Sequence, residues 1–227
     1  MSALPQPATV FLVDDDPPVR RSVERLVRAE RWNVVTFNSP QEFLEKQDPD
    51  TPGCLVLDVA MPGCDGLELQ QTLARMGNRL PIVFLTGHGD LRMSVRAMKA
   101  GATDFLSKPC PDEELLAAIR LALDQDRQFR RAHAIEQAVD ELLASLTPRE
   151  RQVMLGMVAG RLNKQIAVEL GTAEKTIKIH RARVMEKLRV SSVADLVRLT
   201  ERAYIAYIKT AASKFKAGLS LRHAQRV

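Results

Sequence analysis

The chain has 227 residues, 45% hydrophobic and 27% charged, enough to bury the core of one large domain or two modest ones. No stretch approaches the roughly 18 uninterrupted apolar residues of a membrane-spanning helix, and Asp14 and Arg20 stand where a signal peptide would be apolar. We therefore expect a cytoplasmic protein without a membrane partner. Cys54, Cys64 and Cys110 lack paired C-x-x-C spacing, which fits a reducing compartment and predicts small buried or half-buried thiols.

The net charge of +5 conceals a difference between the two halves of the chain. Residues 1–127 carry 14 basic and 19 acidic residues, a net charge of −5, whereas residues 128–227 carry 19 and 9, a net charge of +10. A strongly basic half favours a polyanionic partner, and nucleic acid is the leading candidate. A solvated basic face is the simpler alternative.

The first 125 residues alternate short apolar runs with amphipathic segments, as is typical of a parallel sheet wrapped by helices. Prolines stand where helix starts are expected, because a proline in the first turn loses no helical hydrogen bond. The repeats predict a doubly wound, flavodoxin-like α/β fold with a five-stranded parallel sheet in the order 2-1-3-4-5. We expect strands near 9–13, 34–37, 54–57, 82–85 and 103–106, and helices near 17–29, 40–45, 66–75, 91–100 and 112–125.

The helical pattern continues past residue 125 in an apolar stripe of Ile135, Val139, Leu142 and Leu146. It predicts a long linker helix, whose stripe either forms a short coiled-coil seam or packs on one of the domains.

Short helical segments follow and predict a small all-α domain, with a tight helix-turn-helix between its second and third helices. We expect its helices near 148–159, 164–170, 173–188 and 193–202. The expected organisation is thus a first domain at 8–126, a helical linker at 127–145, a helix-turn-helix domain at 146–202 and a basic tail at 203–227.

Carboxylates are expected to gather at one edge of the sheet. Asp14 and Asp15 follow the first strand and Asp58 follows the third, so all three should lie where ligands bind in doubly wound sheets. Their repulsion calls for a cation, and their hard oxygens favour Mg²⁺. Thr86 and Lys108 follow the fourth and fifth strands and should overhang the same edge. These groups can transfer a phosphoryl group to a carboxylate. Taken singly, each could instead be a helix cap, a turn hydroxyl or a solvated lysine.

Five separated motifs resemble the receiver domain of two-component response regulators: Asp14-Asp15, Asp58 followed by Met61-Pro62-Gly63, Thr86-Gly87-His88-Gly89, Phe105, and Lys108-Pro109. The resemblance covers residues 8 to 126 and implies that a sensor histidine kinase phosphorylates Asp58. It implies that Asp15 binds Mg²⁺ directly, with Asp14 assisting through water and the carbonyl of Ala60 as a further ligand.

The same resemblance assigns the remaining receiver residues. Thr86 and Lys108 would contact the phosphoryl oxygens, and Thr86 and Phe105 would rearrange as a switch. The Lys108–Pro109 peptide bond is expected to be cis.

The second domain resembles the LuxR-type helix-turn-helix in Leu146-Thr147-Pro148-Arg149-Glu150-Arg151, Asn163-Lys164-Gln165-Ile166-Ala167 and Thr176-Ile177-Lys178-Ile179-His180-Arg181. Together with the receiver motifs, these segments identify the chain as a member of the NarL/FixJ family of response regulators. The strings Thr86-Gly87-His88-Gly89-Asp90 and Met98-Lys99-Ala100-Gly101-Ala102 are most similar to the FixJ branch.

Helical periodicity divides the third helix of this domain into two faces. The core face should hold Ala173, Ile177, Val184 and Leu188, and the outer face should hold Lys175, Lys178, Ile179, Ala182, Arg183 and Glu186. An exposed isoleucine beside lysines is unfavourable in water but can contact a thymine methyl group in a major groove. Lys178 and Ile179 are therefore the expected base-reading residues, whereas Ala182, where some relatives have lysine, casts doubt on carrying over their operator. Phosphate contacts are expected from Thr147, Lys164, Thr176, Arg181 and Arg183.

We interpret the chain as a phosphorylation-switched transcription factor that binds double-stranded promoter DNA, with RNA polymerase as a further partner. Phosphorylation should promote a homodimer through Val95 and Met98, which lie beside the switch. The chain is not expected to be an enzyme beyond assisting phosphorylation and dephosphorylation of Asp58. A phosphatase using an aspartyl phosphate would need an acid where Ala60 stands. The remaining alternative is a constitutive DNA-binding regulator whose first domain is only a scaffold or dimerisation module.

Overall fold

The computed structural model describes residues 8–63, 65–87 and 91–201. Cys64, His88 and the basic tail at 203–227 lie outside the described residues. The chain forms two compact units, Met1–Arg131 and Ala132–Val227, which divide inside the segment expected to be a linker. None of the described helices is long and apolar enough to cross a membrane.

The first unit contains a five-stranded parallel sheet in the order β2-β1-β3-β4-β5, which confirms the predicted topology. The strands are β1 (Thr9–Val13), β2 (Asn33–Phe37), β3 (Gly53–Leu57), β4 (Ile82–Thr86) and β5 (Asp104–Ser107). The interior strands β1, β3 and β4 are buried along their whole length, whereas the edge strand β2 alternates between exposed and less exposed residues. Apolar runs therefore mark strands covered on both faces.

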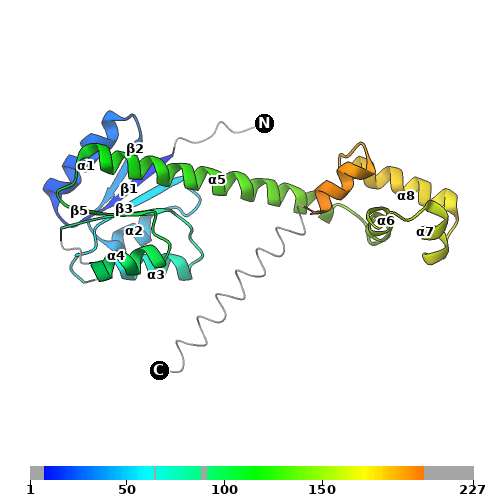
Figure 1. The fold of residues 1–227 in the computed structure, drawn as a ribbon, viewed down its shortest axis with the longest axis horizontal. Helices are drawn as coiled ribbons and strands as arrows, with labels where there is room; N and C mark the ends of the chain where they lie inside the picture. Colours follow the sequence, from blue (N-terminus) through cyan, green and yellow to red (C-terminus); the bar gives the residue numbers. More distant parts are fainter. Residues whose placement is uncertain (1–7, 64, 88–90, 202–227) are drawn as a thin grey trace, which may run out of the picture. The chain divides into compact units, whose positions relative to one another are not determined.

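Helices cover both faces of the sheet (Figure 1). They are α1 (Pro17–Ala29), α2 (Pro40–Lys46), α3 (Gly66–Arg75), α4 (Leu91–Lys99) and α5 (Asp112–Ala144). Successive strand residues point to opposite faces. Thus Phe11 and Val13 join a core covered by α2, α3 and α4, whereas Val10 and Leu12 join a core covered by α1 and α5.

Helix α5 continues without interruption from the sheet into the second unit, which confirms the predicted long helix. Its apolar stripe is not uniform. Val139 and Leu146 are buried and Leu142 packs on the core of the second unit, but Ile135 is 57% exposed. The second half of the stripe therefore belongs to the second unit.

The second unit is all helical, with α6 (Pro148–Val158), α7 (Asn163–Glu169), α8 (Glu174–Lys187) and a further helical segment at residues 193–201. The turn between α7 and α8 passes through Gly171, whose φ of +60° favours glycine. Ile177, Val184 and Leu188 are buried as expected. Ala173 is exposed, so its assignment to the core face was wrong: it is the N-cap of α8 and precedes the helical face.

Candidate functional site

Two acidic side chains and one lysine meet at the carboxyl edge of the sheet. Asp14 follows β1, Asp58 follows β3 and Lys108 follows β5, so the strand order brings residues up to 94 positions apart together. The Lys108 Nζ atom lies 2.5 Å from Asp14 Oδ2 and 3.0 Å from Asp58 Oδ1. Asp14 and Asp58 are 1% and 5% exposed. The lysine therefore bridges two buried carboxylates.

Burial and charge oppose each other at this site. Burial raises the pKa of the Asp58 carboxyl, whereas the hydrogen bond and charge of Lys108 lower it, and the net effect is a raised pKa. For Lys108, burial lowers the pKa, but hydrogen bonds to the two carboxylates outweigh burial, so its pKa is raised. The ammonium of Lys108 is therefore held in its charged form between the two carboxyl groups.

The lysine bridge supplies one cation to two of the three carboxylates that the sequence places at this edge. Asp15 is exposed, and the described residues include no cluster of three acidic, histidine or cysteine side chains that could hold a metal ion. The donors proposed from the sequence are nevertheless all oxygens, a set that fits Mg²⁺.

Thr86 and Phe105 extend the site across the sheet. Thr86 is fully buried at the end of β4, and its carbonyl oxygen accepts a hydrogen bond from Lys108 N at 2.7 Å. Phe105 is half-buried on β5, with its ring centroid 5.8 Å from that of Phe84. The Lys108–Pro109 peptide bond is cis, as expected. A backbone hydrogen bond thus connects Thr86 to the lysine, and a ring contact connects Phe105 to Phe84 on the neighbouring strand β4.

The face of α4 exposes apolar side chains. Val95 and Met98 are 42% and 46% exposed, and Leu91, which the sequence argument did not name, is 79% exposed. Three such side chains on one short helix form an apolar surface beside β5.

Gly66 positions Asp58 but was not singled out as a functional residue. A methyl group on Gly66 would lie 2.3 Å from the main-chain oxygen of Asp58, and Gly66 N donates to Val59 O at 2.9 Å. The first turn of α3 therefore packs directly on the backbone that carries the candidate phosphoacceptor. Only a residue without a side chain permits this approach.

Gly66→Ala is therefore expected to displace the backbone at Asp58 and to slow phosphorylation by acetyl phosphate by about 10- to 100-fold. Gly77→Ala is the matched control, because Gly77 has a φ of +74° and open space around it. That variant should lose about 1 kcal/mol of stability but keep its phosphorylation rate. A wild-type rate for Gly66→Ala, measured by intact mass over time, would contradict this role.

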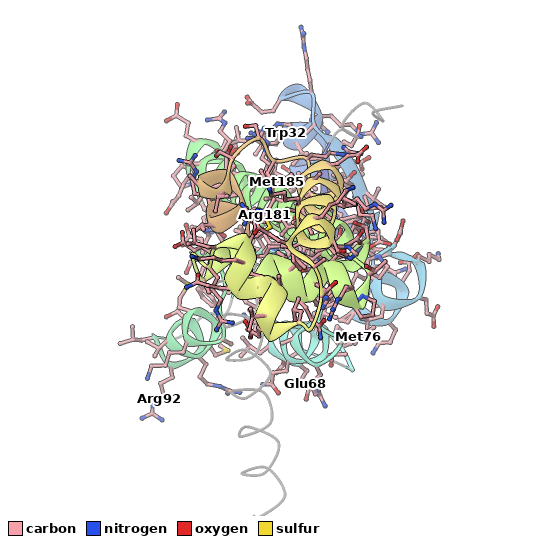
Figure 2. All side chains as sticks on the ribbon, turned by 90° about the vertical axis from the view of Figure 1, so that its right-hand side faces the viewer. Trp32, Glu68, Met76, Arg92, Arg181 and Met185 are labelled. Atoms are coloured by element: carbon pink, nitrogen blue, oxygen red, sulfur yellow. The ribbon has the colours of Figure 1, made fainter. Side chains whose placement is uncertain are left out.

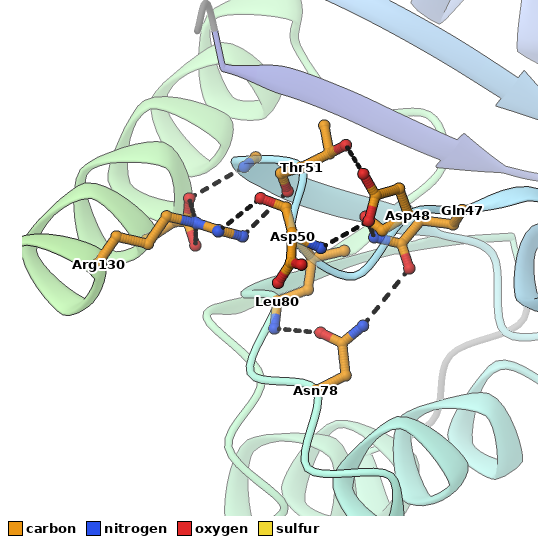
Figure 3. A network of polar contacts seen from close by, with 9 residues as sticks. Gln47, Asp48, Asp50, Thr51, Asn78, Leu80 and Arg130 are labelled. Carbon is orange, nitrogen blue, oxygen red and sulfur yellow. Dashed lines mark hydrogen bonds and ion pairs between the residues drawn. The ribbon is translucent and has the colours of Figure 1, made fainter. Parts of the chain in front are cut away.

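A second polar network fixes the start of β3 against α5 (Figure 3). Arg130 forms an ion pair with Asp126 at 2.9 Å and donates to the carbonyl oxygens of Asp50 and Thr51 at 2.8 and 3.0 Å. Asp126, 4% exposed, also accepts from Gly53 N at 3.0 Å. Through these bonds, α5 contacts the rest of the first unit as far along the helix as Arg130. Arg130 and Asp50 are 80 positions apart in the sequence, so helical periodicity does not predict the hydrogen bond between them.

The residues expected on the outer face of α8 are all exposed: three cations, one acid and two apolar residues. Lys178 and Ile179 are exposed, and the ammonium of Lys178 lies 3.6 Å from the carboxylate of Glu174. The expected phosphate contacts are more varied in exposure: Lys164 and Arg183 are exposed, and Thr176 and Arg181 are half-buried. Figure 2 shows Arg181 with Met185 on the next turn of α8.

Lys164 and Arg181 line one hollow of about 530 Å³ together with Arg161, which the sequence argument did not name. Glu174 lines the same hollow and Arg161 forms an ion pair with Glu169, so the hollow carries a net positive charge rather than three free cations. Thr147 is exposed at the N-cap of α6, where its hydroxyl oxygen accepts a hydrogen bond from Glu150 N at 3.3 Å.

A buried carboxylate joins the end of α8 to the start of α6. Glu150 is 3% exposed and accepts from Lys187 Nζ at 2.6 Å and from Thr147 N at 2.9 Å. Lys187 also donates to the carbonyl oxygen of Ser145 at 3.1 Å, just beyond the end of α5. Helix α8 is therefore tied to the segment that precedes α6.

This network predicts acid sensitivity of the second unit. The hydrogen bond from Lys187, followed by that from Thr147 N, lowers the pKa of the Glu150 carboxyl to about 2 from an ordinary value of 4.5. A lowered pKa stabilises the fold fully above the ordinary value, and this stabilisation is lost as pH falls toward 2. Thermal unfolding followed by far-UV circular dichroism at about pH 6 and about pH 3 should therefore show a loss of stability in acid.

The two units can be followed separately, because the single tryptophan, Trp32, lies in the first. The acid-sensitive transition should appear in circular dichroism and be absent from Trp32 fluorescence. Glu150→Gln should be less stable at neutral pH and lose less stability in acid, whereas the exposed control Glu141→Gln should behave as wild type. Equal acid sensitivity in wild type and Glu150→Gln would exclude this carboxylate as a cause.

Comparison with known families agrees with the division into two units. Residues 10–120 match the response regulator receiver domain, and residues 144–200 match the luxR family of bacterial regulatory proteins.

Similar proteins cover most of the chain. It is 50% identical over 194 residues to Nodulation protein W of Bradyrhizobium diazoefficiens, covering 86% of each chain. It is 44% identical over 195 residues to the response regulator protein TodT of Pseudomonas putida, again covering 86% of each. The transcriptional regulatory protein FixJ of B. diazoefficiens is 42% identical over 194 residues, which cover 86% of this chain and 95% of that protein.

Two solved structures of similar proteins also cover most of the chain. The response regulator StyR is 47% identical with a TM-score of 0.83, covering 86% of this chain and 99% of that one. Full-length FixJ from B. japonicum is 41% identical with a TM-score of 0.54, covering 87% of this chain and 98% of that one.

Proposed function

Because the chain belongs to the transcriptional response regulators that join a receiver domain to a LuxR-type DNA-binding domain, we propose that phosphorylation of Asp58 switches its binding to promoter DNA. Regulators of this type receive phosphate from sensor histidine kinases and bind DNA. The observation that carries the proposal is the buried pair of carboxylates held by Lys108 at the carboxyl edge of the sheet. A solvent-exposed aspartate would have neither the bridging lysine nor the burial that keeps water away from its carboxylate.

The proposed chemistry is attack by an Asp58 carboxylate oxygen on the phosphorus of a phosphohistidine or acetyl phosphate. The bond between phosphorus and the donor breaks, and an acyl phosphate forms on Asp58. Lys108 and the Thr86 hydroxyl would then bind phosphoryl oxygens. Mg²⁺, held by the carboxylates of Asp14, Asp15 and Asp58 and the carbonyl of Ala60, would neutralise charge on the phosphoryl group. The chain would assist its own phosphorylation and dephosphorylation.

Phosphorylation would act through residues next to the site. Movement of Thr86 toward the phosphoryl group would draw Phe105 inward and change the surface that carries Val95 and Met98. A homodimer formed there would place two helix-turn-helix units on half-sites about 34 Å apart. RNA polymerase is a further proposed partner at the promoter.

DNA recognition is assigned to the second domain. We propose that Lys178 and Ile179 read bases, and that phosphates are contacted by Thr147, Lys164, Thr176, Arg181 and Arg183. The functional boundaries remain those proposed from the sequence: receiver 8–126, linker 127–145, DNA-binding domain 146–202 and basic tail 203–227.

Peptide mapping and sedimentation test this proposal. Acetyl phosphate with Mg²⁺ should add one phosphoryl group to the peptide that contains Asp58, and sedimentation should show a shift from monomer to dimer. Val95→Glu with Met98→Glu should keep the phosphoryl group but lose the dimer. A sedimentation coefficient unchanged by phosphorylation would remove dimerisation from the proposal, and a phosphoryl group on any other residue would contradict the assigned acceptor.

A further inference from the structure

A hollow of about 330 Å³ lies at the amino edge of the sheet in the first unit. Its walls come from α3, the start of β4, the residues that follow α4, and the part of α5 just before residue 131. Ile82 begins β4 and lines the hollow, whereas Thr86 ends the same strand at the phosphoacceptor, about 13 Å farther along. The hollow is therefore separate from the site that carries Asp58.

The lining of this hollow combines apolar surface with a single charge. Leu73, Leu80 and Ile82 are buried and contribute apolar surface, and Phe129 on α5 adds an aromatic ring that is 37% exposed. Of the described residues that line the hollow, Arg79 is the only charged one, so none of them is acidic. An apolar lining with one cation suits an anion that has an apolar body.

Two side chains in the lining have hydrogen-bond donors without an acceptor among the described residues. The guanidinium carbon of Arg79 lies 5.0 Å from the centroid of the Phe129 ring, and no described acidic side chain forms an ion pair with it. Gln125 accepts from Thr103 Oγ1 at 2.8 Å through its amide oxygen, and its amide nitrogen donates to no described residue. A guanidinium over an aromatic face keeps its N–H groups, whose planar fork matches a carboxylate.

Polar contacts hold the two walls that carry these groups (Figure 3). On one wall, the side-chain oxygen of Asn78 accepts from Leu80 N at 2.9 Å and fixes the turn that contains Arg79. On the other wall, Arg130 follows Phe129 in α5 and forms an ion pair with Asp126 at 2.9 Å. Walls that are ordered before a ligand arrives reduce the entropy lost on binding.

We propose that this hollow binds a small aromatic carboxylate. The carboxylate group accepts hydrogen bonds from Arg79 and Gln125, and the ring packs against Phe129 and the buried leucines. The volume is near the lower end of the range of ligand pockets, roughly 300–1,000 Å³, which suits a single ring. Residues 203–227 carry five basic residues and no acidic one, so like charge disfavours this segment as the occupant. The inference does not depend on phosphorylation of Asp58.

Titration with benzoate, followed by nuclear magnetic resonance of the isotopically labelled full-length chain, tests this site. The side-chain amide signal of Gln125 and the backbone amide signal of Gly101, which also lines the hollow, should shift and saturate. A Kd of about 1 mM is expected for a ligand with so few atoms. Acetate has the charge without the ring, and benzyl alcohol has the ring without the charge. Each should bind about fivefold more weakly than benzoate.

Two arginine variants separate the charge in the hollow from charge nearby. Arg79→Gln should weaken benzoate binding about fivefold and leave benzyl alcohol binding unchanged. The matched control is Arg75→Gln, because Arg75 is an exposed arginine in the last turn of α3 that does not line the hollow. This control should bind benzoate as wild type does. Denaturant unfolding followed by Trp32 fluorescence should show that both variants remain folded.

Each outcome of these titrations bears on one part of the proposal. If the Gln125 and Gly101 signals do not respond to benzoate well above the expected Kd, the hollow is not a ligand site. If benzyl alcohol binds as tightly as benzoate, or if Arg79→Gln and wild type bind benzoate equally, the assignment of a carboxylate ligand is overturned.

Discussion

Asp58→Asn is expected to abolish phosphorylation and to leave DNA affinity at its unphosphorylated level. A carboxamide offers no nucleophilic oxygen to phosphorus, so no acyl phosphate can form. The substitution preserves the size of the side chain and one carbonyl oxygen that can accept from Lys108, so the fold should persist. Intact mass after incubation with acetyl phosphate and Mg²⁺ measures the loss, and Trp32 fluorescence confirms that the receiver remains folded.

The control for this prediction is Asp124→Asn, which removes an exposed carboxylate on α5 that pairs only with Arg127 in the described contacts. This variant should gain one phosphoryl group at the wild-type rate. Phosphorylation of Asp58→Asn to the wild-type extent would show that another residue is the acceptor.

Lys108→Met should have the second large effect, on both chemistry and stability. It removes the cation between Asp14 and Asp58 and leaves two buried carboxylates facing each other. Breaking a buried pair costs 3–5 kcal/mol, but the Lys108 side chain is 22% exposed, so solvent screening reduces the expected loss to about 1–3 kcal/mol. Phosphorylation should also become far slower, because the cation that would bind the phosphoryl group is missing.

The stability of Lys108→Met should depend on pH and Mg²⁺ in a defined direction. Without the lysine the pKa of Asp58 rises further, and a raised carboxyl pKa means that stability is recovered as pH falls through it. Mg²⁺ should stabilise this variant more than wild type, because binding to the folded state alone increases stability and a divalent cation can replace the lost charge.

The exposed pair of Lys46 and Glu42 provides the control for these measurements. Lys46→Met removes an ion pair whose lysine side chain is 63% exposed, so receiver stability should change by less than about 1 kcal/mol. Denaturant unfolding followed by Trp32 fluorescence gives all three stabilities. If Lys108→Met is as stable as Lys46→Met at neutral pH and does not respond to Mg²⁺, the lysine is not the neutralising cation.

The strands could be predicted because their apolar runs are local, and the strand order followed from the doubly wound fold class. Apolar runs such as 9–13 mark strands buried on both faces, and Pro17 and Pro40 mark helix starts in the positions that the structure confirms. Helix ends were less accurate. Ala173 shows the reason: it fits the apolar period of α8 but acts as its N-cap, and periodicity does not distinguish the first helical residue from the one before it.

The contacts that complete the sites could not be predicted in the same way. Lys108 was placed at the correct edge of the sheet, but its bridge to Asp14 depends on distances between side chains on separate strands. The bonds of Glu150 to Lys187 and of Arg130 to Asp50 join residues 37 and 80 positions apart. A single sequence shows these residues only as charged positions on helices or in a turn, and such positions are usually solvated. Gly66 resembles any helix-start glycine until the backbone of Asp58 is placed against it.

The most direct test of the central claim is the DNA affinity of one full-length preparation before and after phosphorylation, at two salt concentrations, for wild type and Asp58→Asn. The account predicts that phosphorylation tightens binding only in wild type, and that affinity falls with salt as phosphate contacts require. If wild type binds DNA with the same affinity with and without the phosphoryl group, the proposed switch is contradicted. The receiver would then be only a scaffold.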